Sequence, residues 1–144
     1  MPLTFKYKNF ERPDGSSSYG PYIPLTIKGP EASIDMLFLL DSGADYTVIP
    51  IELAEILGLD LSKPKERTSG VGGKIYTKLS DMVVELKNAH EKYTFKIPIH
   101  VILKKNSNVP PLLGRASFFN KFQITFNQRE GKIVFKRAHR KDKY

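Results

Sequence analysis

The sequence of 144 residues contains no cysteine, so neither disulfide bonds nor cysteine-ligated zinc can stabilise it. Its three histidines are scattered without the spacing of metal ligands, and we expect no metal and no cofactor. No apolar stretch approaches the length that spans a bilayer, and residues 1–6 lack the apolar core of a signal peptide. These absences predict a cytoplasmic protein without membrane contact, whose stability comes from packing and assembly.

Length and composition predict a single domain over residues 1–144. A hydrophobic content of 40% is enough for a core at this length, and no internal repeat indicates two lobes in one chain. The net charge of +8 would suit a nucleic-acid partner. However, most basic residues alternate with apolar ones, and the densest cluster is residues 136–144, which we expect to form a disordered basic tail. We therefore favour a solvated basic surface over a nucleic-acid site.

Much of the chain has the two-residue period of β-strands. Apolar residues alternate with polar ones at 5–7, 23–27, 34–38, 93–103, 122–126 and 133–135. Pro24 lacks an amide donor, which predicts an edge position for its strand. Residues 12–21 are rich in turn formers and should form a hairpin loop or an arm. His100 falls on the polar side of its strand, so we expect it to be solvated rather than catalytic.

Two short helices are expected between these strands. Residues 51–57 have a helical pattern, with Pro50 suited to the first turn and Gly58 to the end. Ser117 is expected to cap a second short helix over residues 118–121.

The central feature of the sequence is Asp41-Ser42-Gly43, which interrupts two apolar runs. The preceding run predicts a buried strand, and the small residues permit a tight turn and close approach of another chain. By itself, Asp-Ser-Gly is also an ordinary turn sequence. A second apolar run stops at Gly114-Arg115, and this second motif raises the first above a chance turn.

Together the two motifs resemble those of the retropepsin-like aspartic proteases, the single-lobe relatives of pepsin. That family is marked by hydrophobic-hydrophobic-Asp-Thr/Ser-Gly-Ala and, later, by hydrophobic-hydrophobic-Gly-Arg. The resemblance implies a mainly β fold, a single-lobe pepsin-like β-barrel with a flap hairpin and one or two short helices. The sequence departs from the commoner pattern in Ser42, which replaces Thr, and in Ala116, which stands where Asp or Asn often follows Gly-Arg.

The resemblance implies a catalytic Asp41, with Ser42 and Gly43 supporting a pair of aspartates. Because the chain holds one such motif, the second aspartate would come from a second copy of the chain in a homodimer. Terminal strands would join the two copies, either around residues 5–7 or around residues 133–135. The implied substrate is an extended peptide or unfolded protein.

The Gly-rich segment 68–74 predicts a hairpin tip, which by resemblance would be the flap over the substrate. A plain hairpin turn is the alternative. The implied substrate-binding residues are Gly43, Ala44, Asp45, Gly70, Val71, Gly72 and Gly73. The resemblance also implies a structural ion pair between Asp45 and Arg115.

Three functional hypotheses follow from the sequence. The leading one is an aspartic endopeptidase that activates water between two copies of Asp41. The second is a catalytically weak or inactive dimeric peptide-binding module of the same fold. The third is a nucleic-acid binder that depends on the basic tail, which the charge pattern does not favour.

Overall fold

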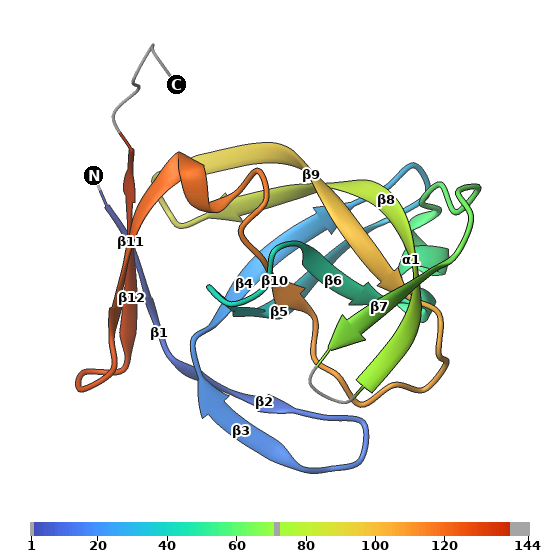
Figure 1. Cartoon of the computed structure of the whole chain (residues 1–144). Coiled ribbons are helices and arrows are strands. Elements are labelled where there is room, and N and C mark those ends of the chain that lie inside the picture. The colour runs from blue at the N-terminus through green and yellow to red at the C-terminus, as the bar shows by residue number, and fades with distance from the viewer. Residues whose placement is uncertain (1, 71–72, 139–144) are drawn as a thin grey trace.

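The computed structural model, which describes residues 2–70 and 73–138, is built mainly of β-strands (Figure 1). The elements are β1 (Leu3–Lys6), β2 (Lys8–Glu11), β3 (Ser17–Gly20), β4 (Tyr22–Lys28), β5 (Ser33–Leu40), β6 (Thr47–Pro50), α1 (Ile51–Leu57), β7 (Glu66–Gly70), β8 (Gly73–Lys87), β9 (Lys92–Ile102), β10 (Leu112–Leu113), the 3₁₀ turn η1 (Phe119–Lys121), β11 (Phe122–Asn127) and β12 (Lys132–Arg137). The predicted mainly β, single-lobe fold with short helices is confirmed.

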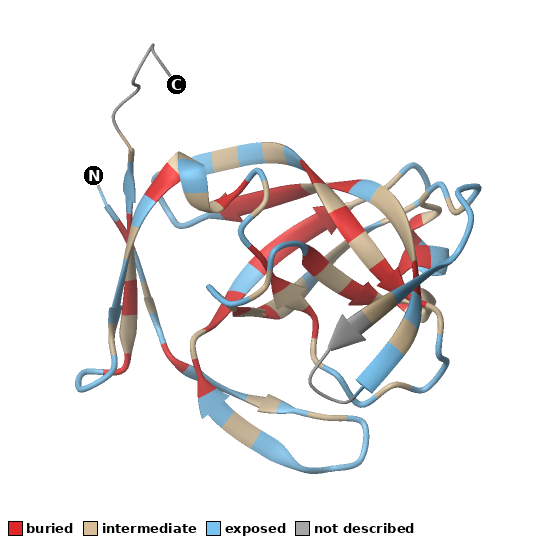
Figure 2. Ribbon diagram, viewed as in Figure 1, coloured by how far each residue is buried: buried red, intermediate tan, exposed pale blue. Residues whose placement is uncertain are grey.

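The central sheet closes on itself. Its strand order is β4-β5-β10-β6-β9-β8-β7, and β4 pairs with β8 as well as with β5. Alternating residues of β9, namely Ile97, Ile99 and Val101, are fully buried, because one side of each strand faces the interior (Figure 2). Pro24 lies in the part of β4 that pairs only with β5, so its predicted edge position is confirmed.

The two ends of the chain meet in a three-stranded antiparallel sheet with the order β1-β12-β11. It stands at one side of the central sheet (Figure 1). Phe135 and Phe122 face inward and pack edge to face, 5.6 Å between ring centroids, and Phe118 joins them. The prediction of a disordered tail from residue 136 is wrong for Lys136 and Arg137, because both belong to β12, and the Arg137 guanidinium lies over the Tyr93 ring. Residues 139–144 of that predicted tail lie outside the described residues.

Strands β2 and β3 form an antiparallel arm below the central sheet (Figure 1). Residues 12–21 therefore include a strand as well as the loop that their turn formers predicted. The rings of Phe10 and Tyr22 stack 5.0 Å apart at the base of the arm. At its tip, the Asn108 amide donates a 2.8 Å hydrogen bond to the Asp14 carboxylate. The arm thus contacts the loop that leads into β10.

Helix α1 ends as predicted at Gly58, whose left-handed conformation lets its amide bond to the Ala54 and Glu55 carbonyls. Pro50 is the last residue of β6 and precedes the first turn. The predicted cap at Ser117 is wrong: η1 has no side-chain cap, and Ser117 has a φ of 61°. The Arg115 carbonyl instead accepts the amides of Phe118 and Phe119. Among the described residues, the helices are too short or too polar to span a membrane.

Candidate active site

The short strand β10 brings the two sequence motifs together. Leu112 pairs in parallel with Leu39 of β5 and antiparallel with Val48 of β6. The Asp41 amide, just past the end of β5, donates a 3.1 Å hydrogen bond to the Leu113 carbonyl. Because parallel strands end at the same edge of a sheet, Asp41 and Gly114 follow their strands side by side.

The turn at Asp41 is held by its own backbone. The Gly43 amide donates a 2.8 Å hydrogen bond to Asp41 Oδ1, and the Ala44 amide donates to the Asp41 carbonyl. Asp41 is half-buried, whereas Ser42 and Gly43 are exposed. Among the described residues, Asp41 Oδ2 has no hydrogen-bond partner. One oxygen thus fixes the carboxylate, and the other can bind a water or a second carboxyl group.

The second motif, around Gly114 and Arg115, holds this turn through hydrogen bonds of its backbone amides. The Arg115 and Ala116 amides donate 2.9 Å hydrogen bonds to the Ala44 and Asp45 carbonyls. The Gly114 amide donates to the hydroxyl of Thr47, which is fully buried. The Gly-Arg motif is therefore a backbone brace for the turn at Asp41.

Gly114 is required by the closeness of this contact. A Cβ atom at this position would lie 2.3 Å from the Tyr46 carbonyl oxygen, well inside van der Waals contact. Gly114 was predicted from the sequence as part of the second motif, whereas Thr47 was not. The only signal for Thr47 was a hydroxyl at the start of an otherwise apolar strand.

Asp45 and Arg115 form an ion pair, in which the side chains are 75% and 52% exposed. The pair joins the turn to the residue that follows Gly114. At this exposure it contributes little to the stability of a single chain. The arrangement leaves both charged groups accessible to a partner.

His100 is half-buried, although its strand register predicted a solvated side chain. Its Nδ1 lies 3.2 Å from the Thr77 hydroxyl, and its ring centroid is 4.8 Å from that of Tyr46. Burial lowers the pKa of His100, while the charge of Glu66 acts in the opposite direction. His100 therefore connects Tyr46, the residue after Asp45, to Thr77 of β8.

The predicted hairpin is formed by β7 and β8, in which Gly70 pairs with Gly73. The hydroxyls of Thr68 and Thr77 lie 2.9 Å apart across the hairpin. Gly73 has a φ of 106°, which favours glycine. The predicted contacts at Val71 and Gly72 lie outside the described residues. The hairpin is therefore present, and its role as a flap stays a prediction.

A shallow hollow of about 380 Å³ opens beside Tyr46. Its other lining residues include Leu79 and Ser80 of β8 and Lys96 and Pro98 of β9. The Ser80 hydroxyl is buried there without a hydrogen-bond partner among the described residues. Nowhere in residues 2–70 and 73–138 do three His, Cys, Asp or Glu side chains gather closely enough to hold a metal ion.

The chain is similar in sequence or in fold to known proteases. The sequence model of the family described as aspartyl protease matches residues 23–116. The crystal structure of a retropepsin-like aspartic protease from Rickettsia conorii is similar over 94% of this chain and 90% of that chain, with 20% identity and a TM-score of 0.55. The EIAV protease complexed with the inhibitor HBY-793 matches 67% of this chain and 82% of that chain, with 21% identity and a TM-score of 0.41. No curated protein sequence matches the chain.

Proposed function

The chain belongs to the aspartyl protease family, and from that premise we propose that it is an aspartic endopeptidase, active as a homodimer. The observation that carries the proposal is the half-buried Asp41, whose Oδ1 is fixed by Gly43 while Oδ2 has no partner among the described residues. This is the arrangement that a reactive carboxylate requires, since it is oriented but not neutralised by its own chain.

Peptide hydrolysis of this type needs two carboxyl groups that share one proton. The ionised group accepts a proton from the attacking water, and the protonated group donates a hydrogen bond to the scissile carbonyl. Two carboxyl groups about 3 Å apart cannot both ionise readily, so their apparent pKa values separate and belong to the pair. Asp45, the other carboxylate of the turn, is paired with Arg115 and does not supply the second group.

A second copy of the chain supplies the missing carboxyl group. A two-fold axis beside the turn brings Asp41 of each protomer to the same place, because such an interface uses the same surface twice. In this arrangement the exposed Ser42 supports the dyad by hydrogen bonding across the axis. Gly43 leaves room for the substrate backbone.

The substrate is an extended peptide or an unfolded protein. Its main chain bonds in the manner of a β-strand to Gly43, Ala44 and Asp45 on one side and to the β7–β8 hairpin on the other. The hairpin, with Gly70 and Gly73 beside its tip, acts as the flap that excludes water from the reaction. All of these groups belong to one domain, residues 1–144.

The direct test is Asp41→Asn, which keeps the shape of the side chain but removes the acid. We expect wild-type protein to cleave an unfolded polypeptide at mildly acidic pH and the variant to lose that cleavage. Asp81→Asn is the matched control, because Asp81 is an exposed carboxylate of β8 that pairs with Lys96. Persistent cleavage by Asp41→Asn would contradict the proposal.

Mixing the two proteins tests whether the dyad is shared between chains. If subunits exchange at random, adding an equal amount of Asp41→Asn lowers wild-type activity by about half, because mixed dimers hold one acid. Unchanged activity would show that one chain suffices. A wild-type dimer that binds peptides without cleaving them would identify the protein as a peptide-binding module instead.

A further inference from the structure

The two faces of the β7–β8 hairpin differ in their chemistry. Residues 63–78 contain five lysines and arginines and one acid, Glu66. Arg67 pairs with Tyr76, and the neighbouring Glu66 pairs with Thr77. Side chains alternate along a strand and paired residues share a face, so these two pairs lie on opposite faces of the hairpin. Thr77 is buried, so its face is the inner one, and the face of Arg67 and Tyr76 is the outer one.

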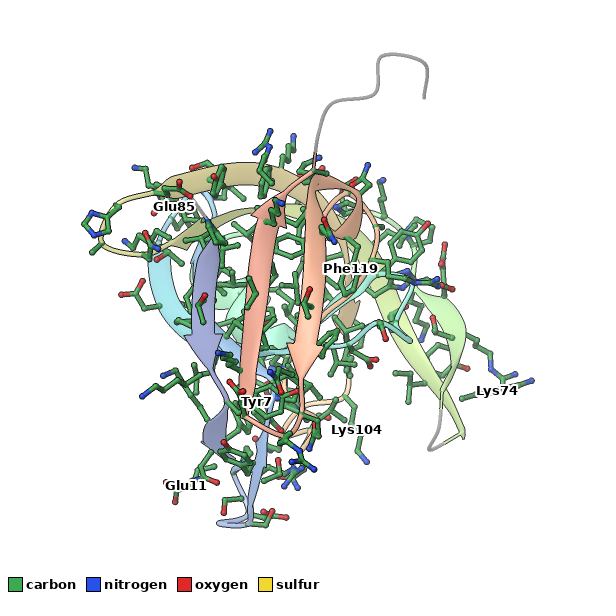
Figure 3. The ribbon with its side chains drawn as sticks, turned by 90° about the vertical axis from the view of Figure 1, so that its left-hand side faces the viewer. Tyr7, Glu11, Lys74, Glu85, Lys104 and Phe119 are labelled. Atoms are coloured by element: carbon green, nitrogen blue, oxygen red, sulfur yellow. The ribbon has the colours of Figure 1, made fainter. Side chains whose placement is uncertain are left out.

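The outer hairpin face is formed by Lys65, Arg67, Lys74 and Tyr76. Lys74 lies two residues before Tyr76 in β8 and therefore shares its face. All three cations are exposed, and Lys74 projects from the hairpin away from the rest of the chain (Figure 3). Among residues 2–70 and 73–138, none of the three has an ion-pair partner. The outer hairpin face thus carries positive charge that the described chain does not neutralise.

Tyr76 orders two of these cations without removing their charge. Its ring is 47% exposed, with the Lys65 ammonium 4.9 Å and the Arg67 guanidinium 6.0 Å from the ring centroid. A lysine or arginine that is free in solvent loses side-chain entropy when it binds a carboxylate. Because contact with the ring already restricts Lys65 and Arg67, less entropy is lost on binding. The cluster is therefore better suited to an anionic ligand than scattered surface lysines are.

The outer hairpin face lies close to the candidate active site along the chain. The hollow beside Tyr46 is also lined by Lys63, two residues before Lys65, and by the ion pair of Asp81 and Lys96. Strand β7 ends the strand order of the central sheet, so a chain can pass over its edge. Neighbouring strands are about 4.8 Å apart and an extended chain advances about 3.3 Å per residue, so about three residues cross the hairpin. A polypeptide in the cleft can therefore reach its outer face.

We propose that the outer hairpin face binds an acidic segment of the polypeptide substrate, several residues away from the bond that is cleaved. The inference rests on the proposed function, and it names the class of substrate, namely extended polypeptides that carry aspartates or glutamates beyond the cleft. Carboxylates form charge-assisted hydrogen bonds with lysine and arginine, and the guanidinium of Arg67 can bind one with two parallel bonds. This contact adds to those proposed for Gly70 and Gly73 at the hairpin.

The geometry around Tyr76 favours an acidic polypeptide over a nucleic acid. Single-stranded nucleic acids bind largely by stacking their bases on exposed aromatic rings. Lys65 and Arg67 already lie over the Tyr76 ring, so a base that stacks where they lie would displace them. Carboxylates can bind the two cations and leave both in contact with the ring. The proposed function also brings a polypeptide to this hairpin.

The inference predicts a preference between two peptides that differ in charge alone. Each contains the stretch that the wild type cleaves in an unfolded polypeptide, extended by a flexible spacer and by a run of either glutamates or glutamines. At about pH 6 the glutamates are ionised. We expect kcat/KM to be about tenfold higher for the glutamate peptide, mainly through a lower KM, because three exposed charge pairs each contribute a little. High salt should reduce the preference by screening these charges.

Arg67→Glu and Arg129→Glu are matched variants, because each replaces one exposed arginine and changes the net charge equally. Arg129 lies in the turn between β11 and β12, on the opposite side of the molecule from the β7–β8 hairpin (Figure 1). Arg67→Glu should abolish the preference for the glutamate peptide, whereas Arg129→Glu should retain it. Lys65→Glu is a second variant of the same surface and should also reduce the preference. Comparing the two peptides within each variant separates this effect from any change in cleavage itself.

Equal kcat/KM values for the two peptides with the wild type at low salt would overturn the inference and leave the proposed function intact. A preference that survives both Lys65→Glu and Arg67→Glu would also overturn it, by assigning the acidic segment to another surface. The same conclusion would follow if Arg129→Glu lost the preference as fully as Arg67→Glu, because the net charge of the chain would then be its cause.

A binding measurement tests the inference without cleavage. In fluorescence anisotropy, Asp41→Asn protein should bind the labelled glutamate peptide more tightly than the glutamine peptide, and adding Arg67→Glu should remove the difference. A wild type that cleaves neither peptide would contradict the proposed function, whereas equal binding of the two peptides would overturn the inference alone. A labelled single-stranded RNA that binds more tightly than the glutamate peptide, and that Arg67→Glu releases, would overturn it by assigning the face to a nucleic acid.

Discussion

Two regions of the chain differ in how far their charged side chains are buried. The carboxylate of Glu85 is 5% exposed and is contacted by Lys28, Lys87 and Lys92. At the candidate active site, Asp45 and Arg115 are 75% and 52% exposed, and each is the other's ion-pair partner. The buried carboxylate of Glu85 thus has ion-pair partners within the chain, whereas the ion pair of Asp45 and Arg115 is open to solvent.

At the candidate site the backbone is held by hydrogen bonds within the chain, although the charged side chains are exposed. The turn that begins at Asp41 is braced by the amides of Gly114, Arg115 and Ala116, and its end is fixed by the buried Thr47. The backbone of the turn is thus hydrogen-bonded as in the protein interior, while its polar side chains remain accessible to solvent. The chain itself therefore sets the geometry of this turn, and in the proposed dimer that geometry would need no rearrangement on binding.

Gly114→Ala should have the largest effect on the stability of the single chain. The added Cβ would lie 2.3 Å from the Tyr46 carbonyl oxygen and force the brace away from the turn. We expect a loss of about 3 kcal/mol in the free energy of unfolding, measured by urea denaturation, together with loss of cleavage. Gly20→Ala is the control, since its Cβ would meet only the Tyr22 ring at an ordinary 3.5 Å. Equal stability of the two variants would show that the brace is not under this steric constraint.

Glu85→Gln should have the next largest effect, and that effect should depend on pH. The hydrogen bond from Lys28 and the charges of the neighbouring lysines hold the pKa of Glu85 below its ordinary value of 4.5. A lowered pKa means that ionised Glu85 stabilises the folded chain above about pH 4.5, and that this stabilisation is lost as the pH falls toward the folded-state pKa. We expect a lower melting temperature for Glu85→Gln at pH 7.

The difference between wild type and Glu85→Gln should shrink on acidification below pH 4.5. Glu55→Gln, at an exposed position of α1, is the control and should melt as the wild type does. A difference that stays constant between pH 7 and pH 3 would show that packing rather than charge at Glu85 causes the loss.

These two regions differ in how far the sequence predicted them. The turn at Asp41 was predicted because small residues interrupt two apolar runs there, and the second motif, at Gly114-Arg115, raised it above a chance turn. The strands followed from alternation, and the end of α1 followed from Gly58. The Glu85 cluster was not predicted, because Lys28, Lys87 and Lys92 come together only when β4 pairs with β8 and β8 with β9.

Other features were missed for the same reason. Thr47 and His100 acquire their roles from residues distant in the chain, Gly114 and Thr77 respectively. The cap at Ser117 was predicted from a local preference, but the tight backbone after Arg115 places Ser117 at positive φ instead. Local patterns thus predicted where the chain turns, whereas contacts between distant strands determined which polar groups are paired.

Arg115→Ala should have the smallest effect on the stability of the single chain. It also tests most directly whether the exposed ion pair differs from the buried Glu85 cluster. Because the pair with Asp45 is exposed, its loss should change the free energy of unfolding of the protomer by less than about 1 kcal/mol. We expect dimerisation and cleavage to weaken together nevertheless, because contact with a second copy would bury Asp45 and make its unpaired charge costly. Sedimentation, cleavage and urea denaturation of the same variant separate these effects. A fully dimeric Arg115→Ala protein would show that the ion pair lies outside the interface, and a large loss of protomer stability would show that the pair acts like the Glu85 cluster.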